Sequence, residues 1–106
     1  MSSGFVLHPE AARDLSEIWE FIARDNIAAA GRVREEMLEA IRSLATFRMQ
    51  GHRRPDLSSR ALRFRTVRNY LIAYTPEEKP PLVVAVVHGR RSPRVISAML
   101  RSREGD

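Results

Sequence analysis

The sequence predicts one α+β domain over residues 1–106, in which a hairpin of two helices packs on a small antiparallel sheet. Three observations lead to this class. Apolar residues recur with the period of a helix in the first half of the chain, they follow the pattern of strands in the second half, and turn-forming residues separate the segments. Strands that follow helices as a block are typical of α+β proteins. We expect the order β-α-α-β-β-β with a short C-terminal helix.

The first half is predicted to contain a short strand and two helices. The apolar run at residues 5–7 ends before Pro9, which suits the first turn of a helix. A second helix is expected over residues 27–47, after Asp25 and the capping residue Asn26. The short connection makes the two helices antiparallel neighbours. The first helix should bury a stripe of large apolar residues at helical spacing, namely Leu15, Ile18, Trp19 and Ile22.

Three strands are predicted in the second half. Residues 62–66 alternate between uncharged residues and arginines, so one face should be apolar and the other cationic. Residues 68–69 are the expected turn, because Asn69 tolerates positive φ, and residues 70–74 form the next strand. Residues 82–88 are almost wholly apolar, as expected at the centre of a sheet that helices cover.

A short helix is expected at the C-terminus. Ser92 and Pro93 are typical of a helix cap and first helical position, and the segment after them has an amphipathic pattern. The tail from Arg101 to Asp106 is expected to fray.

The composition excludes several classes of protein. Without cysteine the chain has neither disulfides nor thiolate metal sites. Its three histidines are scattered, its glycines are isolated, and no apolar run approaches the ~20 residues that cross a bilayer. A secretory signal pattern is not recognisable at the N-terminus. We therefore expect a cytoplasmic protein with no metal, no cofactor and no membrane association.

Charge divides the chain into two unlike halves. Residues 1–50 contain six arginines and eight acidic residues, whereas residues 51–106 contain twelve basic and five acidic residues. This asymmetry indicates an anionic partner for the second half, either nucleic acid or an acidic polypeptide.

Three short stretches carry a resemblance to a known family. Residues 9–24 (PEAARDLSEIWEFIAR) are like the first helix of ParE-like proteins, residues 63–74 (RFRTVRNYLIAY) look like that family's hairpin, and residues 86–91 (VVHGRR) are similar to its strand end. Asn69 stands where glycine is common in the family. Over about Phe5 to Leu100 the chain thus resembles the RelE/ParE toxin superfamily, and in particular its ParE-like branch.

The resemblance implies the toxin of a type II toxin–antitoxin system, a class associated with growth arrest and plasmid stabilisation. A cognate antitoxin, a small DNA-binding protein, would neutralise the toxin by wrapping it with a C-terminal tail. ParE-like members poison DNA gyrase, whereas RelE-like members cleave mRNA on the ribosome. Contacts with the target or the antitoxin are expected from the clustered arginines, namely Arg63, Arg65, Arg68, Arg90, Arg91 and Arg94.

The residues present favour the gyrase branch. Metal-free RNA cleavage needs a base, an acid and cations at the phosphate, and arginine is a poor acid or base because its pKa exceeds ~12. The ribonuclease branch often has a tyrosine or histidine near its C-terminus, but none follows His88 here. We therefore expect a gyrase poison rather than an enzyme. A ribosome-dependent ribonuclease remains the alternative, and its catalytic residues would be Arg63, Arg65, His88 and Arg90. A third hypothesis, based on charge alone, is a non-toxic nucleic-acid-binding module.

Overall fold

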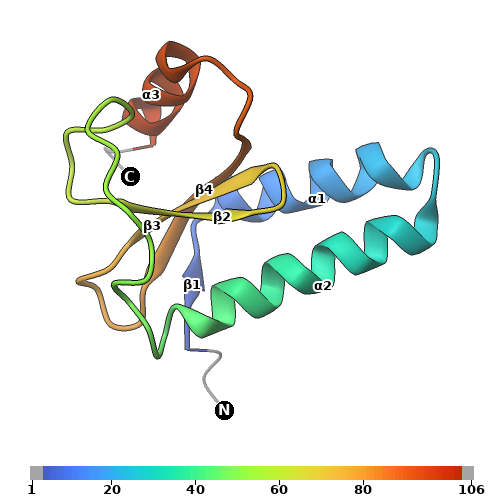
Figure 1. Cartoon of the computed structure of the whole chain (residues 1–106), viewed down its shortest axis with the longest axis horizontal. Coiled ribbons are helices and arrows are strands. Elements are labelled where there is room, and N and C mark those ends of the chain that lie inside the picture. The colour runs from blue at the N-terminus through green and yellow to red at the C-terminus, as the bar shows by residue number, and fades with distance from the viewer. Residues whose placement is uncertain (1–3, 104–106) are drawn as a thin grey trace.

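The computed structural model describes residues 4–103; residues 1–3 and 104–106 lie outside the described part. It confirms the predicted α+β class and element order (Figure 1). In chain order the elements are β1 (Val6–Leu7), α1 (Pro9–Ala23), α2 (Ile27–Ser43), β2 (Arg63–Val67), β3 (Tyr70–Thr75), β4 (Leu82–His88) and α3 (Pro93–Ser102).

The helices begin where the sequence places their caps. The His8 Nδ1 atom accepts a hydrogen bond from the Glu10 N–H, and Pro9 follows as the first helical residue of α1. The Asn26 side chain accepts from the Ala29 N–H, and Ser92 caps α3 in the same way. The main difference is that α2 ends at Ser43 rather than near residue 47, and turns continue the chain from there.

The sheet is mixed rather than wholly antiparallel. Its strand order is β1-β4-β3-β2, and the short β1 runs parallel to β4 while the other neighbours are antiparallel. The predicted turn between β2 and β3 is present, but Arg68 has the positive φ of +55° and Asn69 does not. Because β4 lies between β1 and β3, it is central, as its apolar sequence predicts.

A bulge in β4 changes which of its groups point outward. Ala73 pairs with Ala85 but the next residue, Tyr74, pairs with Val83, so Val84 is an extra residue in β4. Val83 therefore faces the helical hairpin, whereas Val84 and its neighbour Ala85 both belong to the core on the opposite face. The bulge thus reverses the direction of the backbone N–H and C=O groups along the second half of the strand.

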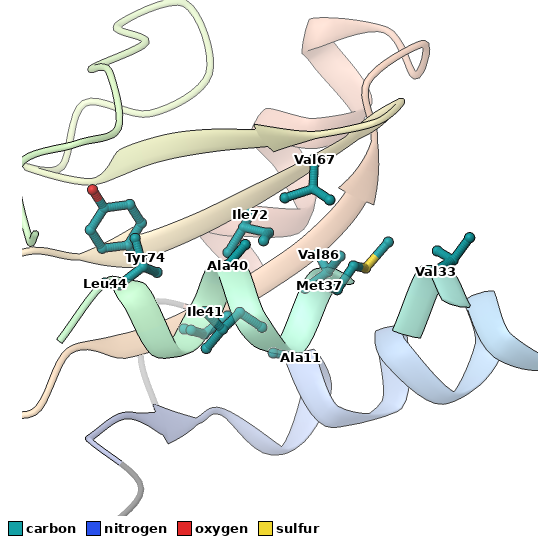
Figure 2. Packing of buried hydrophobic residues seen from close by; sticks show 11 residues of the cluster. Ala11, Val33, Met37, Ala40, Ile41, Leu44, Val67, Ile72, Tyr74 and Val86 are labelled. Carbon is teal, nitrogen blue, oxygen red and sulfur yellow. The ribbon is translucent and has the colours of Figure 1, made fainter. Parts of the chain in front are cut away.

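One core lies between the sheet and the helical hairpin. Figure 2 shows Met37 and Ile41 of α2, with Leu44 directly after the helix, on the side of the sheet that carries Ile72 and Val86. All five side chains are almost completely buried. The period-3.6 stripe of α2 and the inward positions of β3 and β4 thus meet as predicted.

The opposite face of the sheet is also apolar, and this corrects the expectation of a cationic outer face. Phe64, Leu71 and Val87 are buried there under Ile96 and Leu100 of α3 and under the loop before β2. The arginines that alternate with Phe64 on β2 instead share the hairpin side with Val67. Because β2 is the edge strand, their guanidinium groups still reach the solvent.

The helical hairpin extends well beyond the sheet, as Figure 1 shows. For this reason the apolar stripe of α1 is less buried than predicted: only Ala11 is fully buried, whereas Ile18, Trp19 and Ile22 are half-buried. Phe21, near the end of α1, is 66% exposed.

Tyr74 fixes the loop that follows α2. Its buried hydroxyl accepts a hydrogen bond from the Gly51 N–H (2.9 Å) and donates one to the Arg48 carbonyl (2.8 Å). Burial raises the pKa of the Tyr74 phenol, and the hydrogen bond from Gly51 offsets part of that effect. An added Cβ at Gly51 would lie 2.9 Å from both the Phe64 carbonyl oxygen and the Tyr74 hydroxyl, so this approach requires glycine.

We predict that Tyr74→Phe lowers the free energy of unfolding by about 1–3 kcal/mol, because the Gly51 N–H and the Arg48 carbonyl lose their partner. Urea unfolding followed by circular dichroism measures the change. Tyr70→Phe is the matched control, since the Tyr70 hydroxyl makes no hydrogen bond within residues 4–103. Equal losses in the two variants would contradict this role of Tyr74.

Candidate functional site

A groove beside α1 follows the outer edge of β4. Because β1 pairs only with Leu82 and Val83, the rest of this edge has no neighbouring strand within residues 4–103. Asp14 of α1 accepts a hydrogen bond from the Val86 N–H (2.9 Å) at this edge. Arg103 donates to the Val84 carbonyl oxygen (2.9 Å).

Asp14 and Arg103 also pair with each other. The two guanidinium nitrogens of Arg103 donate to the two carboxylate oxygens of Asp14 at 2.8 and 3.1 Å. Their side chains are only 13% and 9% exposed. The pair joins α1, the edge of β4 and the end of α3. The expected fraying is therefore wrong for residues 101–103, whereas residues 104–106 lie outside the described part.

The groove beside this pair has a volume of about 490 Å³ and lies between α1 and α3. Apolar side chains line part of it, among them the exposed Phe21 and the half-buried Ile18 and Met99. By the alternation of the strand, the Val86 carbonyl and the His88 N–H face it. The charged side chains along it are of both signs, namely Glu10, Arg13, Asp14, Glu17, Arg91 and Arg103.

His88 ends β4 at the mouth of this groove. Its Nδ1 atom accepts a hydrogen bond from the Arg90 N–H (3.1 Å), which assigns the proton of the neutral ring to Nε2. The Tyr70 ring packs edge-on against the imidazole, with 5.2 Å between the ring centroids. His88 is therefore a histidine at the end of a strand whose ring accepts a hydrogen bond from the backbone.

Arg63 and Arg65 hold the loop that follows α2. Arg63 donates to the Gly51 carbonyl oxygen (2.7 Å), and Arg65 donates through Nε to the Gln50 side chain (2.6 Å). Both arginines are half-buried. Each therefore has a role in the packing of this chain, whatever else it contacts.

Arg68 connects the β2–β3 turn to the hairpin. Its guanidinium makes two parallel hydrogen bonds to the Glu36 carboxylate, at 2.6 and 2.7 Å. These bonds hold the pKa of Glu36 below its ordinary value. The pair is about half-exposed, so it is open to screening by salt.

The connection between β4 and α3 brings Arg90, Arg91 and Arg94 together, and all three are exposed. The Gly89 N–H donates to the Asn69 carbonyl oxygen (2.7 Å), so the β2–β3 turn lies at the same end of the sheet. The six predicted contact residues therefore form two groups, one on the edge strand β2 and its turn, the other before and within α3.

The four residues of the alternative ribonuclease site are not assembled in one place. His88 pairs with Tyr70, whereas Arg65 pairs with Ile72, so β3 lies between His88 and the arginines of β2. Two strand spacings of ~4.8 Å and a register offset of ~7 Å separate the Arg65 and His88 backbones. Arg63 is two residues farther along β2.

Within residues 4–103 no cluster of three or more acidic or histidine side chains could hold a metal ion. In the same part of the chain, no helix combines the length and the apolar character that a membrane crossing requires.

Comparison with family models identifies the chain. The model for the ParE toxin of the type II toxin–antitoxin system parDE matches residues 5–93, which include the hairpin, the whole sheet and the β4–α3 connection. The chain belongs to the ParE toxin family. No curated protein matched the sequence. The predicted resemblance to ParE-like toxins is thereby confirmed for most of the chain.

The sequence predicted arginines as the contact residues of this ParE-family toxin. It did not predict the Asp14–Arg103 pair beside the groove. Asp14 was visible only as part of a helix motif, and Arg103 lay in a tail that was expected to fray. A carboxylate within an apolar helix stripe was one available signal, because a buried charge needs a partner. The sequence separation of 89 positions between Asp14 and Arg103 is too large for local patterns to identify that partner.

We predict that Arg103→Met in this ParE-family toxin lowers the free energy of unfolding by about 3 kcal/mol, because Asp14 would be left buried without its cation. Adding Asp14→Leu should restore part of the loss. Urea unfolding measures both changes. Arg101→Met, at an exposed position in the last turn of α3, is the control and should change stability by less than about 0.5 kcal/mol. Similar losses of stability for the Arg101 and Arg103 variants would refute this role of the Asp14–Arg103 pair.

Proposed function

We propose that this ParE-family toxin acts in the cytoplasm by binding the gyrase–DNA complex and poisoning DNA gyrase, and that a cognate antitoxin neutralises it. The observation that carries the choice of target is the family match, which is to the ParE toxin of parDE. A gyrase poison needs a binding surface rather than a catalytic acid and base. The exposed arginines and the hydrogen bonding of His88 support this choice.

The state of His88 argues against an acid–base role. A general base needs a free lone pair within reach of the proton that it takes. In the neutral ring of His88 the Nδ1 lone pair is engaged by the Arg90 N–H, and Nε2 carries the proton. Tyr74 is buried with both of its hydrogen bonds made inside the chain. The Tyr70 ring packs edge-on against His88.

The arginines support a binding role. Those before and within α3, Arg90, Arg91 and Arg94, are exposed and suit an anionic target. Arg63, Arg65 and Arg68 already bond within the chain, but each guanidinium has five N–H donors and retains capacity for a further contact. We propose that the exposed arginines before and within α3 make the principal contact with the gyrase–DNA complex. The arginines of β2 and its turn would contact the same complex beside them.

We propose the groove beside β4 as the antitoxin site. It combines exposed apolar side chains with an unpaired strand edge, a combination that suits a segment that folds on binding. Phe21 is the most exposed apolar residue that lines it. The arginines and acids along the groove would fix the register of a tail that carries both charges.

The purified toxin should convert gyrase into a source of broken DNA. We expect that gyrase, ATP, plasmid and the toxin together yield linear plasmid after denaturation of the proteins, because a poison stabilises the cleaved intermediate. Gel electrophoresis measures the linear fraction. Expression without antitoxin should also filament cells and induce the DNA-damage response.

The ribonuclease alternative gives opposite results in the same strains. Growth arrest with unbroken DNA, and with transcripts cut within ribosome-bound codons, would refute gyrase poisoning. In that case His88→Ala should slow the cutting. Normal growth with abundant folded protein would count against both activities.

We predict that Phe21→Ser weakens binding of the cognate antitoxin by at least about tenfold, because burying a phenylalanine contributes about 1.5–3 kcal/mol and tenfold corresponds to about 1.4 kcal/mol. Isothermal titration with the purified antitoxin measures the effect. Phe47→Ser is the matched control: Phe47 is 63% exposed, close to the 66% of Phe21, but it does not line the groove. Equal losses in both variants would place the antitoxin elsewhere.

A further inference from the structure

An arginine ridge is formed by the connection before α3 and by the exposed face of that helix. It consists of Arg90, Arg91, Arg94 and Arg101, all of which are exposed. Figure 1 shows α3 at the periphery of the molecule, on the opposite side of the sheet from the hairpin. A large partner can therefore approach the exposed residues of α3, and Arg91, before the helix, also lines the groove beside β4.

The helix geometry aligns the ridge. Arg94, Ala98 and Arg101 follow one another at i, i+4 and i+7, so they share one face of α3. Ile96 and Leu100 occupy the buried side and hold the helix to the sheet. Arg94 and Arg101 lie about 10 Å apart along the helix axis. The small side chain of Ala98 lets a partner come close between them.

The ridge has no carboxylate partners within the described part of the chain. Elsewhere in residues 4–103 arginines form ion pairs with carboxylates, namely Arg13, Arg54, Arg68 and Arg103, which pair with Glu10, Asp56, Glu36 and Asp14. Arg90, Arg91 and Arg94 make no such pair there, and the side-chain partner of Arg101 is the Ser97 hydroxyl at 2.8 Å. The four ridge arginines thus form no ion pair within this part of the chain, and Arg91 shares its groove with Glu10 and Glu17.

Part of this charge also lies at the unfavourable end of the helix. The N-terminus of a helix has a partial positive charge and favours acidic residues, yet the first turn of α3 has no acidic residue and contains Arg94. Arg90 and Arg91 precede the same end. Departures of this kind from local electrostatic preference are typical of functional sites.

We propose that the arginine ridge binds the phosphate backbone of double-stranded DNA without regard to its sequence. A protein partner usually needs a large apolar or aromatic anchor, and the Arg94–Ala98–Arg101 stripe has none. Single-stranded nucleic acid is usually held by stacking on aromatic rings, and residues 89–103 contain no Phe, Tyr or Trp. Arginines spaced along an exposed helix face instead suit phosphates of a duplex.

This inference deepens the proposed function, because it assigns the ridge to the DNA that gyrase holds. The choice of DNA rather than duplex RNA rests on that function. Most of the ridge helix lies beyond residue 93, where the family match ends, so the inference concerns this chain in particular.

Fluorescence anisotropy with a labelled 20-base-pair DNA duplex tests the proposal without gyrase. About four phosphate contacts predict that the logarithm of the binding constant falls against the logarithm of salt concentration with a slope of about −3 to −4. An unrelated duplex of the same length should bind equally well.

Two pairs of substitutions separate the ridge from the net charge. Arg94→Gln with Arg101→Gln should weaken binding at least about tenfold at low salt and make the slope shallower by about 2. Arg32→Gln with Arg42→Gln removes the same charge from exposed positions of α2 and should leave the slope unchanged. Circular dichroism verifies that each variant is folded.

Several results would overturn the proposal: no binding at 50 mM salt, equal loss in both double variants, tighter binding to duplex RNA, or displacement by polyglutamate as effective as by unlabelled duplex. Failure of the proposed function looks different. If the chain binds DNA through the ridge but gyrase yields no broken DNA, the ridge stands and the gyrase target is wrong.

Discussion

β4 is buried on both of its faces, and the rest of the structure depends on this constraint. The helical hairpin covers one face, and α3 with the loop before β2 covers the other. A strand in this position must be apolar throughout, which explains its continuous run of valine, alanine and leucine. The arrangement also leaves the outer edge of β4 as the place where polar backbone meets a groove.

At that edge, a charged pair rather than another strand forms hydrogen bonds with the outward backbone groups of β4. β1 covers two residues of β4, and the bulge at Val84 then turns the next outward groups toward Asp14 and Arg103. Unpaired backbone groups in a buried setting are destabilising, so the pair closes what the short β1 leaves open. The same pair ties the end of α3 to α1. The groove between α1 and α3 and the arginine ridge are therefore adjacent, and Arg91 belongs to both.

Periodicity was sufficient to predict the elements, because each helix and strand has a regular pattern and recognisable caps. Asn26 and Ser92 cap helices as their residue types indicate, and residues 82–88 form the central strand. The direction of the β2 arginines was not predictable in this way. Alternation places Arg63 and Arg65 on the opposite face of β2 from Phe64, but it does not say which face turns toward the helical hairpin. The sequence alone also gave no reason to expect a second core under α3.

The candidate site was likewise predictable only in part from the sequence. Exposed arginines near the end of β4 are visible as a cluster in the sequence, whereas the Asp14–Arg103 contact joins residues at opposite ends of the chain. The extent of the groove depends on how far α1 projects past the sheet, which no local pattern encodes.

Native-state hydrogen exchange of the Val86 amide tests most directly whether Asp14 and Arg103 close the edge of β4. The reference is the amide of Val87, which lies opposite Leu71 within the sheet. If the edge is closed, the two amides exchange at similar slow rates, because opening either one requires disruption of the core. Exchange of Val86 many times faster than Val87, as at an unpaired strand edge, would contradict the account.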